Sequence, residues 1–135
     1  KAVVDSVMND ILWYQGGLGI HQLSKENFIS GRQLERLFHE YVGITPKKLS
    51  NLIRYQCLWQ DIVSQRHFNM MDAVHKYGYT DASHLIREFE RYHSMNIRDA
   101  LEMALRKKSK SFPDILFSVF YVRESCRKEE WQLRA

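Results

Sequence analysis

The sequence predicts an all-α fold in which one helical unit occurs twice and a long helix joins the two copies. The pattern Leu-x-Arg-x-Phe-x-x-Tyr at residues 34–41 recurs at residues 85–92, an offset of 51 (85 − 34). A fixed internal period of this kind indicates a repeated structural unit. Apolar residues also follow the spacing of helices through most of the chain, and capping or helix-breaking residues separate these stretches.

The first unit is expected to contain three helices. Residues 3–14 carry an apolar stripe at helical spacing, which Gly16-Gly17 ends. A short helix is predicted near residues 21–26. Ser30 is a good N-cap for the next helix, because its hydroxyl can accept a hydrogen bond from an amide of the first turn. The buried side of that helix would be formed by Leu34, Leu37, Phe38 and Tyr41.

The joining helix is predicted from Pro46 to about Ser64. Gly43 stops the helix before it, Thr45 can cap the new one, and proline is favoured at the first helical position. Nothing interrupts the pattern before Ser64, which gives a length of roughly 30 Å for an α-helix.

The second unit repeats the first. A short helix near residues 70–77, a turn at residues 78–80 and an N-cap at Asp81 lead into a helix that buries Leu85, Phe89 and Tyr92. A last helix is predicted from about residue 97 to residue 107, capped by Asn96. Extended backwards, the offset of 51 pairs Ser30 with Asp81, Phe28 with Tyr79, and Leu23 with Val74.

The end of the chain differs in character. The run from Ile115 to Val122 is rich in β-branched and aromatic residues, which predicts a short strand. Both sides of such a strand would be apolar, so we expect it to pack against the helices or to pair with a second copy in a homodimer. The expected parts are a first unit over residues 1–45, the long helix over 46–64, a second unit over 65–110 and a tail over 111–135.

Composition narrows the classes of function. Lys and Arg outnumber Asp and Glu by 20 to 16, with a net charge of +4, which permits a polyanionic partner. No apolar run is long enough to cross a membrane. Only Cys57 and Cys126 are present, without a pairing pattern, which favours a reduced cytoplasmic protein. The chain does not begin with Met, so we expect it to be part of a longer protein.

Patterns typical of enzymes are not found in the sequence. The six histidines show no metal-ligand spacing, and no Gly-rich phosphate loop or serine nucleophile motif occurs. We therefore expect no catalytic residue, no metal and no cofactor.

Two long segments carry the repeat, ISGRQLERLFHEYVGITPKKL over residues 29–49 and KYGYTDASHLIREFERYHSMNIRDAL over residues 76–101. Both resemble the DNA-binding domain of the AraC/XylS family of transcription regulators, and the resemblance extends from about Ile11 to Lys107. The sequence departs from the family pattern at Ser24, Phe28, Ala73, Val74, Ser94 and Ile97.

The resemblance implies two helix-turn-helix subdomains and sequence-specific binding of double-stranded DNA by a bacterial-type transcription regulator. In such a unit the second helix enters the major groove with the N-terminal half of its outer face. Arginine suits guanine, glutamine adenine and glutamate cytosine, whereas an apolar residue suits the thymine methyl. The base-reading candidates are Arg32, Gln33, Glu35, Arg36, Ser83, His84, Ile86 and Arg87.

Other positions are candidates for phosphate contacts, namely Ser30, Lys47, Lys48, Arg54 and Arg98. The resemblance also implies RNA polymerase as a partner, and an N-terminal effector-binding or dimerisation domain outside this sequence. Two alternatives stay open. The surface of the first reading helix could be solvated and paired as Arg32–Glu35 or Arg36–Glu40. The whole chain could be a helical protein-interaction module that has lost DNA binding.

Overall fold

The computed structural model describes residues 1–64 and 67–107, and every regular element within these ranges is an α-helix. The predicted all-α fold is therefore confirmed. The predicted strand from Ile115 to Val122 and the tail over 111–135 lie outside the described residues. The helices are α1 (Ala2–Trp13), α2 (Ile20–Glu26), α3 (Gly31–Tyr41), α4 (Pro46–Ser64), α5 (Met70–Tyr77), α6 (Ala82–His93) and α7 (Ile97–Lys107).

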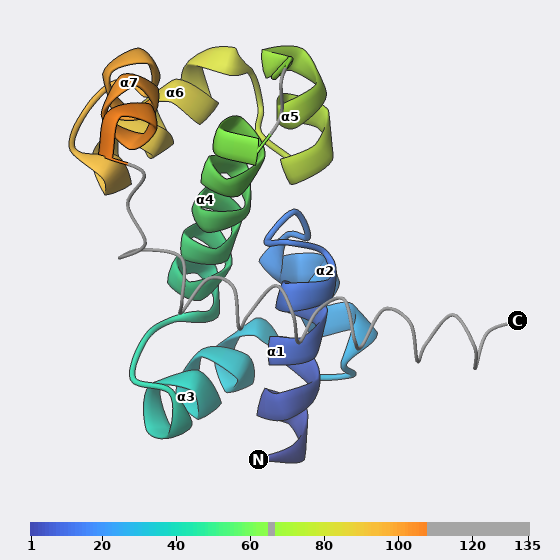
Figure 1. The fold of residues 1–135 in the computed structure, drawn as a ribbon. Helices are drawn as coiled ribbons and strands as arrows, with labels where there is room; N and C mark the ends of the chain where they lie inside the picture. The colour runs from blue at the N-terminus through green and yellow to red at the C-terminus, as the bar shows by residue number, and fades with distance from the viewer. Residues whose placement is uncertain (65–66, 108–135) are drawn as a thin grey trace, which may run out of the picture.

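Helix α4 runs through the middle of the molecule, with α1 to α3 around one end and α5 to α7 around the other (Figure 1). It contacts α1 and α3 of the first unit and α5, α6 and α7 of the second. Because buried residues occur along it from Pro46 to Ile62, α4 belongs to the hydrophobic core of both units. Helix α4 therefore packs against helices of both units, in addition to setting the distance between them.

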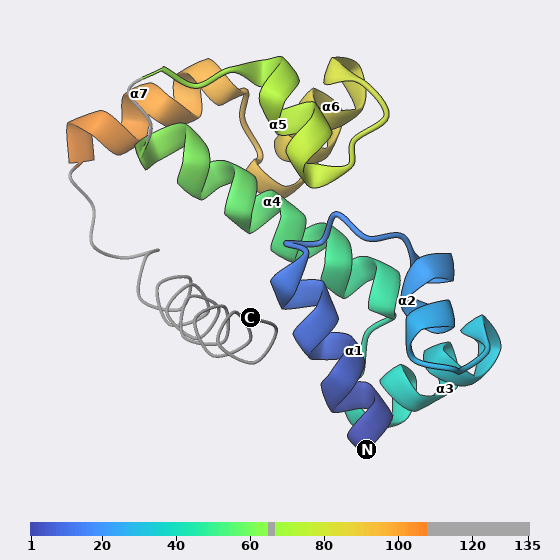
Figure 2. The same cartoon turned by 90° about the vertical axis from the view of Figure 1, so that its right-hand side faces the viewer.

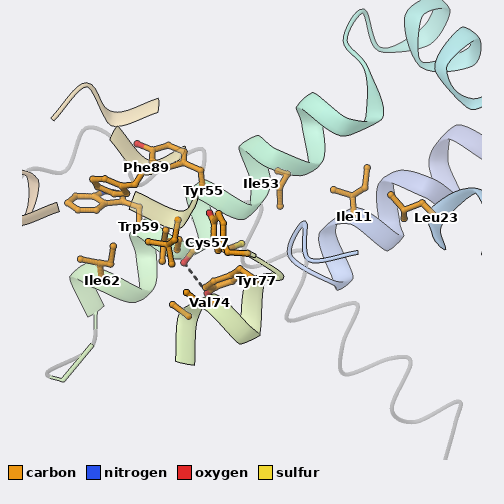
Figure 3. Packing of buried hydrophobic residues seen from close by; sticks show 14 of the residues in the cluster. Ile11, Leu23, Ile53, Tyr55, Cys57, Trp59, Ile62, Val74, Tyr77 and Phe89 are labelled. Atoms are coloured by element: carbon orange, nitrogen blue, oxygen red, sulfur yellow. Dashed lines mark hydrogen bonds between the residues drawn. The ribbon is translucent and has the colours of Figure 1, made fainter. Parts of the chain in front are cut away.

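The buried side chains form one continuous cluster that passes from the first unit to the second along α4 (Figure 3). Ile11 and Leu23 lie at one end, and Trp59 and Phe89 lie at the other. One predicted core position is wrong. Tyr41 is 52% exposed, whereas its repeat equivalent Tyr92 is partly buried against the ring of Tyr55, with 5.2 Å between ring centroids.

The helix starts agree with the predicted caps because capping depends on neighbours in the sequence. In each case a side-chain oxygen accepts a hydrogen bond from the backbone amide three residues later, which satisfies an otherwise unpaired donor. The predicted caps are Ser30, Thr45, Asp81 and Asn96, and Asn69 caps α5 in the same way without having been predicted.

The two helix-turn-helix turns differ in length by one residue. In the first turn, Phe28 adopts a left-handed conformation with φ 54°, and the next amide donates to the carbonyl of Ser24 over 3.1 Å. In the second turn, Gly78 is left-handed with φ 72°, and the next amide donates to the carbonyl of Val74 over 3.0 Å. Phe28 is therefore the structural equivalent of Gly78, and Ser24 that of Val74.

The predicted pairings of Phe28 with Tyr79 and of Leu23 with Val74 are accordingly wrong. The offset is 50 before the turn and 51 from the N-caps onward, because the second turn holds one more residue between its left-handed position and its N-cap. A single inserted residue is invisible to a search at one fixed offset.

The loop between α1 and α2 packs tightly against the rest of the molecule. Gly16 lies so close to α4 that an added Cβ would be 2.2 Å from the carbonyl oxygen of Ser50, whose hydroxyl donates to the Gly16 carbonyl over 3.2 Å. A Cβ on Gly78 would be 2.8 Å from the carbonyl oxygen of Gly17. The first unit's loop therefore touches the second unit's turn directly, backbone against backbone.

An aromatic cluster joins α4 to the end of α6. The ring of His93 stacks on Phe89 with 4.8 Å between centroids and lies 4.4 Å from the ring of Trp59. Its Nδ1 atom lies 2.6 Å from the hydroxyl of Tyr55, which can donate to the neutral imidazole. Burial lowers the pKa of His93 below its ordinary value and raises that of Tyr55 to about 12.

Acid pH is expected to weaken the fold through His93. Because its pKa is lowered in the folded state, the unfolded chain takes up a proton first as the pH falls below about 6.5. The contribution of neutral His93 is complete above that pH and is lost on further acidification. The urea midpoint, measured at pH 7.5 and 5.5, should fall less in His93→Phe than in the unchanged protein. An identical fall in both would show that other groups cause the pH dependence.

Candidate nucleic-acid interface

Helices α3 and α6 each present one face to solvent because the opposite face is fixed in the core. Leu34 and Phe38 anchor α3, and Leu85 and Phe89 anchor α6, all fully buried. The turns that lead into the two helices lie on the same, right-hand side of the molecule in Figure 2, while α7 lies at the left. The N-terminal ends of both helices are thus available on one side of the protein.

The first unit presents its predicted base-reading residues on this exposed face of α3. Arg32, Gln33, Glu35 and Arg36 are all exposed. Arg32 and Arg36 are separated by about one helical turn and therefore share a face. Within the described part of the chain neither arginine forms an ion pair, so the alternative pairs with Glu35 and Glu40 are not formed.

Gln33 and Ser30 hold each other at the start of α3. The Ser30 hydroxyl accepts from the amide of Gln33 over 3.2 Å, and the Gln33 side-chain oxygen accepts from the backbone amide of Ser30 over 3.4 Å. This reciprocal arrangement is a capping box, and its Ser-x-x-Gln spacing is readable from the sequence. Both polar groups are therefore engaged within the helix start in this structure.

The second unit is less uniform. Ser83 and Arg87 are exposed on α6, and Arg87 forms no ion pair among the described residues. Ile86 is exposed and lines an open pocket of about 470 Å³, together with residues that include Met70, Ile97, Glu90 and Asp99.

His84 is turned partly toward the protein. Its Nδ1 accepts from the backbone amide of Thr80 over 3.2 Å, and its Nε2 lies 3.9 Å from a carboxylate oxygen of Glu88. Its ring meets the ring of Tyr79 edge to face, with 5.2 Å between centroids. These contacts fix the imidazole against the turn before α6.

Arg54 lies inside the protein, where its side chain cannot reach a DNA phosphate. Its side chain is buried, and its Nε and Nη2 donate to the two carboxylate oxygens of Glu88 over 3.0 and 2.5 Å. The guanidinium also lies over the ring of Tyr79, 4.2 Å from its centroid. The predicted phosphate contact is therefore wrong, because this arginine joins α4 to α6 inside the protein.

Tyr79 is the third member of the buried network that Arg54 and Glu88 form. The hydroxyl of Tyr79 donates to Glu88 over 3.0 Å, and burial together with the Glu88 charge raises the pKa of Tyr79. Burial alone would lower the pKa of Arg54, but the hydrogen bonds and charge of Glu88 outweigh it and raise the pKa. Arg54 thus stays charged, and its charge is compensated inside the protein.

Sequence reasoning missed Glu88, although a signal was present. The offset of 51 pairs Glu88 with Leu37, which faces the core of the first unit. A carboxylate at an apolar position of a repeat needs a buried cation or a set of donors, because an unpaired buried charge is very costly. The cation that pairs with Glu88 is Arg54, on the facing helix α4.

The remaining phosphate candidates are on the surface. Lys47 and Lys48 are exposed in the first turn of α4. Arg98 is exposed at the start of α7, and its Nε lies 4.0 Å from Glu102. These three cations can move toward a polyanion at little cost, unlike Arg54.

No group of three or more His, Cys, Asp or Glu side chains in residues 1–64 and 67–107 is arranged to hold a metal ion. No helix in the same ranges is long and apolar enough to cross a membrane.

Comparison with known proteins gives two matches. The profile of a family described as "Helix-turn-helix domain" matches residues 23–103, more than half of the chain. The fold is also similar to the crystal structure of a transcriptional regulator from Chromobacterium violaceum, described as one of the AraC-type DNA-binding domain-containing proteins, with a TM-score of 0.64 and 16% identity. That match covers 82% of this chain and 95% of the other, and at this identity the likeness concerns the fold. No curated protein matches the sequence.

Proposed function

Since the chain belongs to the AraC-type helix-turn-helix family of DNA-binding transcription regulators, we propose that α3 and α6 read two successive major-groove segments of one duplex. One observation carries this proposal. Arg36 and Arg87 occupy the same position of the repeat, both are exposed and unpaired among the described residues, and both helices begin on the same side of the protein (Figure 2).

The spacing of the two units suits such a partner. Helix α4 has 19 residues and is therefore about 28 Å long, close to the roughly 34 Å between successive major-groove segments on one face of DNA. The direct contact of Gly17 with Gly78 supports a fixed relative position of the two units.

The first unit would carry most of the base reading. Arg32 and Arg36 can each bind the two acceptors of guanine, and Glu35 can accept from cytosine N4. Gln33 can bind adenine if it leaves its capping box. We expect the cap to stay formed in the complex, so that Gln33 and Ser30 contribute to position more than to sequence choice.

The second unit would add fewer base contacts. Arg87 is the main candidate, with Ser83 beside it and Ile86 able to touch a thymine methyl. His84 is better suited to holding the turn than to reading a base, because its ring already contacts Thr80 and Tyr79. Phosphate contacts are proposed for Lys47, Lys48 and Arg98, and they would position the protein on DNA without sequence choice.

The wider setting is also a proposal. A regulator of this family acts in the cytoplasm on DNA, with RNA polymerase as a partner and with an effector-binding or dimerisation domain elsewhere in the protein. The tail over residues 111–135 is proposed as a contact between two copies. The expected division into residues 1–45, 46–64 and 65–110 is kept as a description of sequence units, with α4 shared by both cores.

Replacing Arg36 or Arg87 by Ala is expected to weaken binding by about 1–3 kcal/mol and to relax base preference in one half of the site only. The measurement is selection of bound sequences from a random duplex pool, followed by affinities for the selected site at fixed salt concentration. Lys47→Ala is the matched control, since loss of a phosphate contact should weaken binding to all sequences alike.

Two results would contradict the proposal. An equal loss of affinity for every DNA sequence would show that the two arginines contact phosphate groups and not bases. Absence of a steep fall in affinity with salt concentration would favour the alternative of a protein-interaction module, because release of counterions from DNA makes binding salt-dependent.

A further inference from the structure

Phe28 is the most exposed aromatic side chain among the described residues. It lies in the turn between α2 and α3, with 97% of its surface open to solvent. Its φ of 54° is in the left-handed region, which bulky side chains rarely adopt. The residue thus combines an unfavourable backbone conformation with an unfavourable exposure, and no contact within the described protein explains either.

The repeat shows which residue relieves this strain. Gly78 occupies the equivalent place in the second turn with φ 72°, and glycine adopts this conformation without a steric penalty. The two places differ in their surroundings. A Cβ on Gly78 would collide with the carbonyl oxygen of Gly17, 2.8 Å away, whereas the first turn leaves its side chain in open space. Only the first unit can therefore present a side chain from this position.

The turn that carries Phe28 is held firmly. The side-chain amide of Asn27 donates to Asp10 in α1 and to the carbonyl of Leu23, each over 2.8 Å. The hydroxyl of Ser6 donates to the oxygen of the same amide over 2.6 Å. Phe28 is therefore projected from a fixed base, and a partner that binds its ring restricts only two side-chain torsions.

The place of Phe28 in the chain indicates which group its ring could contact. Phe28 precedes the N-cap of α3, Ser30, by two residues, so at most about 7 Å of chain separates it from the helix end that enters the groove. Arg32 follows in the first turn of the same helix. If α3 enters the major groove as proposed, a ring at this place is within reach of the groove edge, where the apolar group that a base offers is the C5-methyl of thymine.

We propose that Phe28 makes an apolar contact with a thymine methyl at the edge of the segment read by α3. The inference rests on the proposed function and adds one determinant of sequence that the arginines do not supply. It also gives the two units different specificities, because the second turn carries no side chain at the matching position.

The test replaces each thymine of the selected site in turn by deoxyuridine, which removes the methyl group and leaves base pairing unchanged. In the half of the site read by α3, the unchanged protein should lose about fourfold in affinity at one thymine, the value expected for one buried methyl group. Phe28→Gly should bind the thymine and deoxyuridine duplexes equally at that position. Its melting temperature without DNA should rise, because the left-handed strain is gone.

Two variants serve as controls. Tyr41→Ala removes another exposed aromatic ring, at the far end of α3, and should keep the discrimination between thymine and deoxyuridine. Phe28→Ala removes the ring but keeps a Cβ in the left-handed region, so it should lose the discrimination without the gain in melting temperature.

Each other outcome overturns the inference. Equal sensitivity of Phe28→Gly and the unchanged protein to the methyl group would remove Phe28 from the interface. A loss on every duplex alike would assign the ring to the sugar–phosphate backbone. Loss of self-association in sedimentation, with DNA affinity unchanged, would assign it to a second copy of the chain. If Arg36→Ala also binds every duplex as tightly as the unchanged protein does, the proposed function itself is wrong, together with this inference.

Discussion

Glu88→Ala is expected to destabilise the fold by about 3–5 kcal/mol, a large part of the 5–15 kcal/mol typical of a whole domain. The reason is that the variant leaves the guanidinium of Arg54 buried without its carboxylate and removes the acceptor of the Tyr79 hydroxyl. The measurement is the free energy of unfolding from urea denaturation. A DNA-binding assay should show a parallel loss, because Glu88 ties α6 to α4.

The matched control replaces the whole network by apolar groups. Arg54→Met, Glu88→Leu and Tyr79→Phe together leave no buried charge and no unpaired hydroxyl, and the first unit already holds Leu37 at the position equivalent to Glu88. The triple variant should recover most of the stability that Glu88→Ala loses, since apolar replacements of buried pairs are often neutral or stabilising. If Glu88→Ala is as stable as the unchanged protein, the guanidinium finds solvent and the buried network is not a major source of stability.

Gly16→Ala is expected to be nearly as damaging, with a loss of about 2–5 kcal/mol. The added Cβ would lie 2.2 Å from the carbonyl oxygen of Ser50 and 2.8 Å from the backbone nitrogen of Arg54, both in the rigid α4 helix. Moving the loop away from the helix would stretch the hydrogen bond that the Ser50 hydroxyl donates to the Gly16 carbonyl. Urea denaturation again measures the loss.

Gly43→Ala separates the collision from the backbone effect. Gly43 has a φ of 87°, but nothing lies within 4 Å of an added Cβ. This variant should lose only the cost of an L-residue in the left-handed region, about 1–2 kcal/mol. Equal losses in the two variants would mean that the loop between α1 and α2 moves freely, and that its contact with α4 is unimportant.

Most of the fold could be predicted from the sequence because its signals are local. The side chain of an N-cap such as Ser30, Asp81 or Asn96 accepts a hydrogen bond from the backbone amide three residues later. The start of each helix can therefore be predicted from a few consecutive residues. The exposure of Arg32, Arg36 and Arg87 likewise follows from helical periodicity once the buried stripe is known. Their roles at DNA remain predictions.

The positions that were wrong depend on contacts between distant segments. Arg54 and Glu88 are 34 residues apart, and only the packing of α6 on α4 joins them. Tyr92 is covered because Tyr55 lies beside it, whereas Tyr41 at the same point of the repeat is half exposed. The one-residue difference between the two turns is equally invisible without the left-handed conformations of Phe28 and Gly78.

The shared role of α4 has a consequence for the newly made protein. The chain leaves the ribosome from its N-terminus, so the first unit can close on the first half of α4 early. Tyr55 and Trp59, on its second half, lack the ring of Phe89 as a neighbour until α6 has been synthesised. At typical rates of synthesis this takes about 2–6 seconds, during which an aromatic surface is open to other nascent chains and to chaperones.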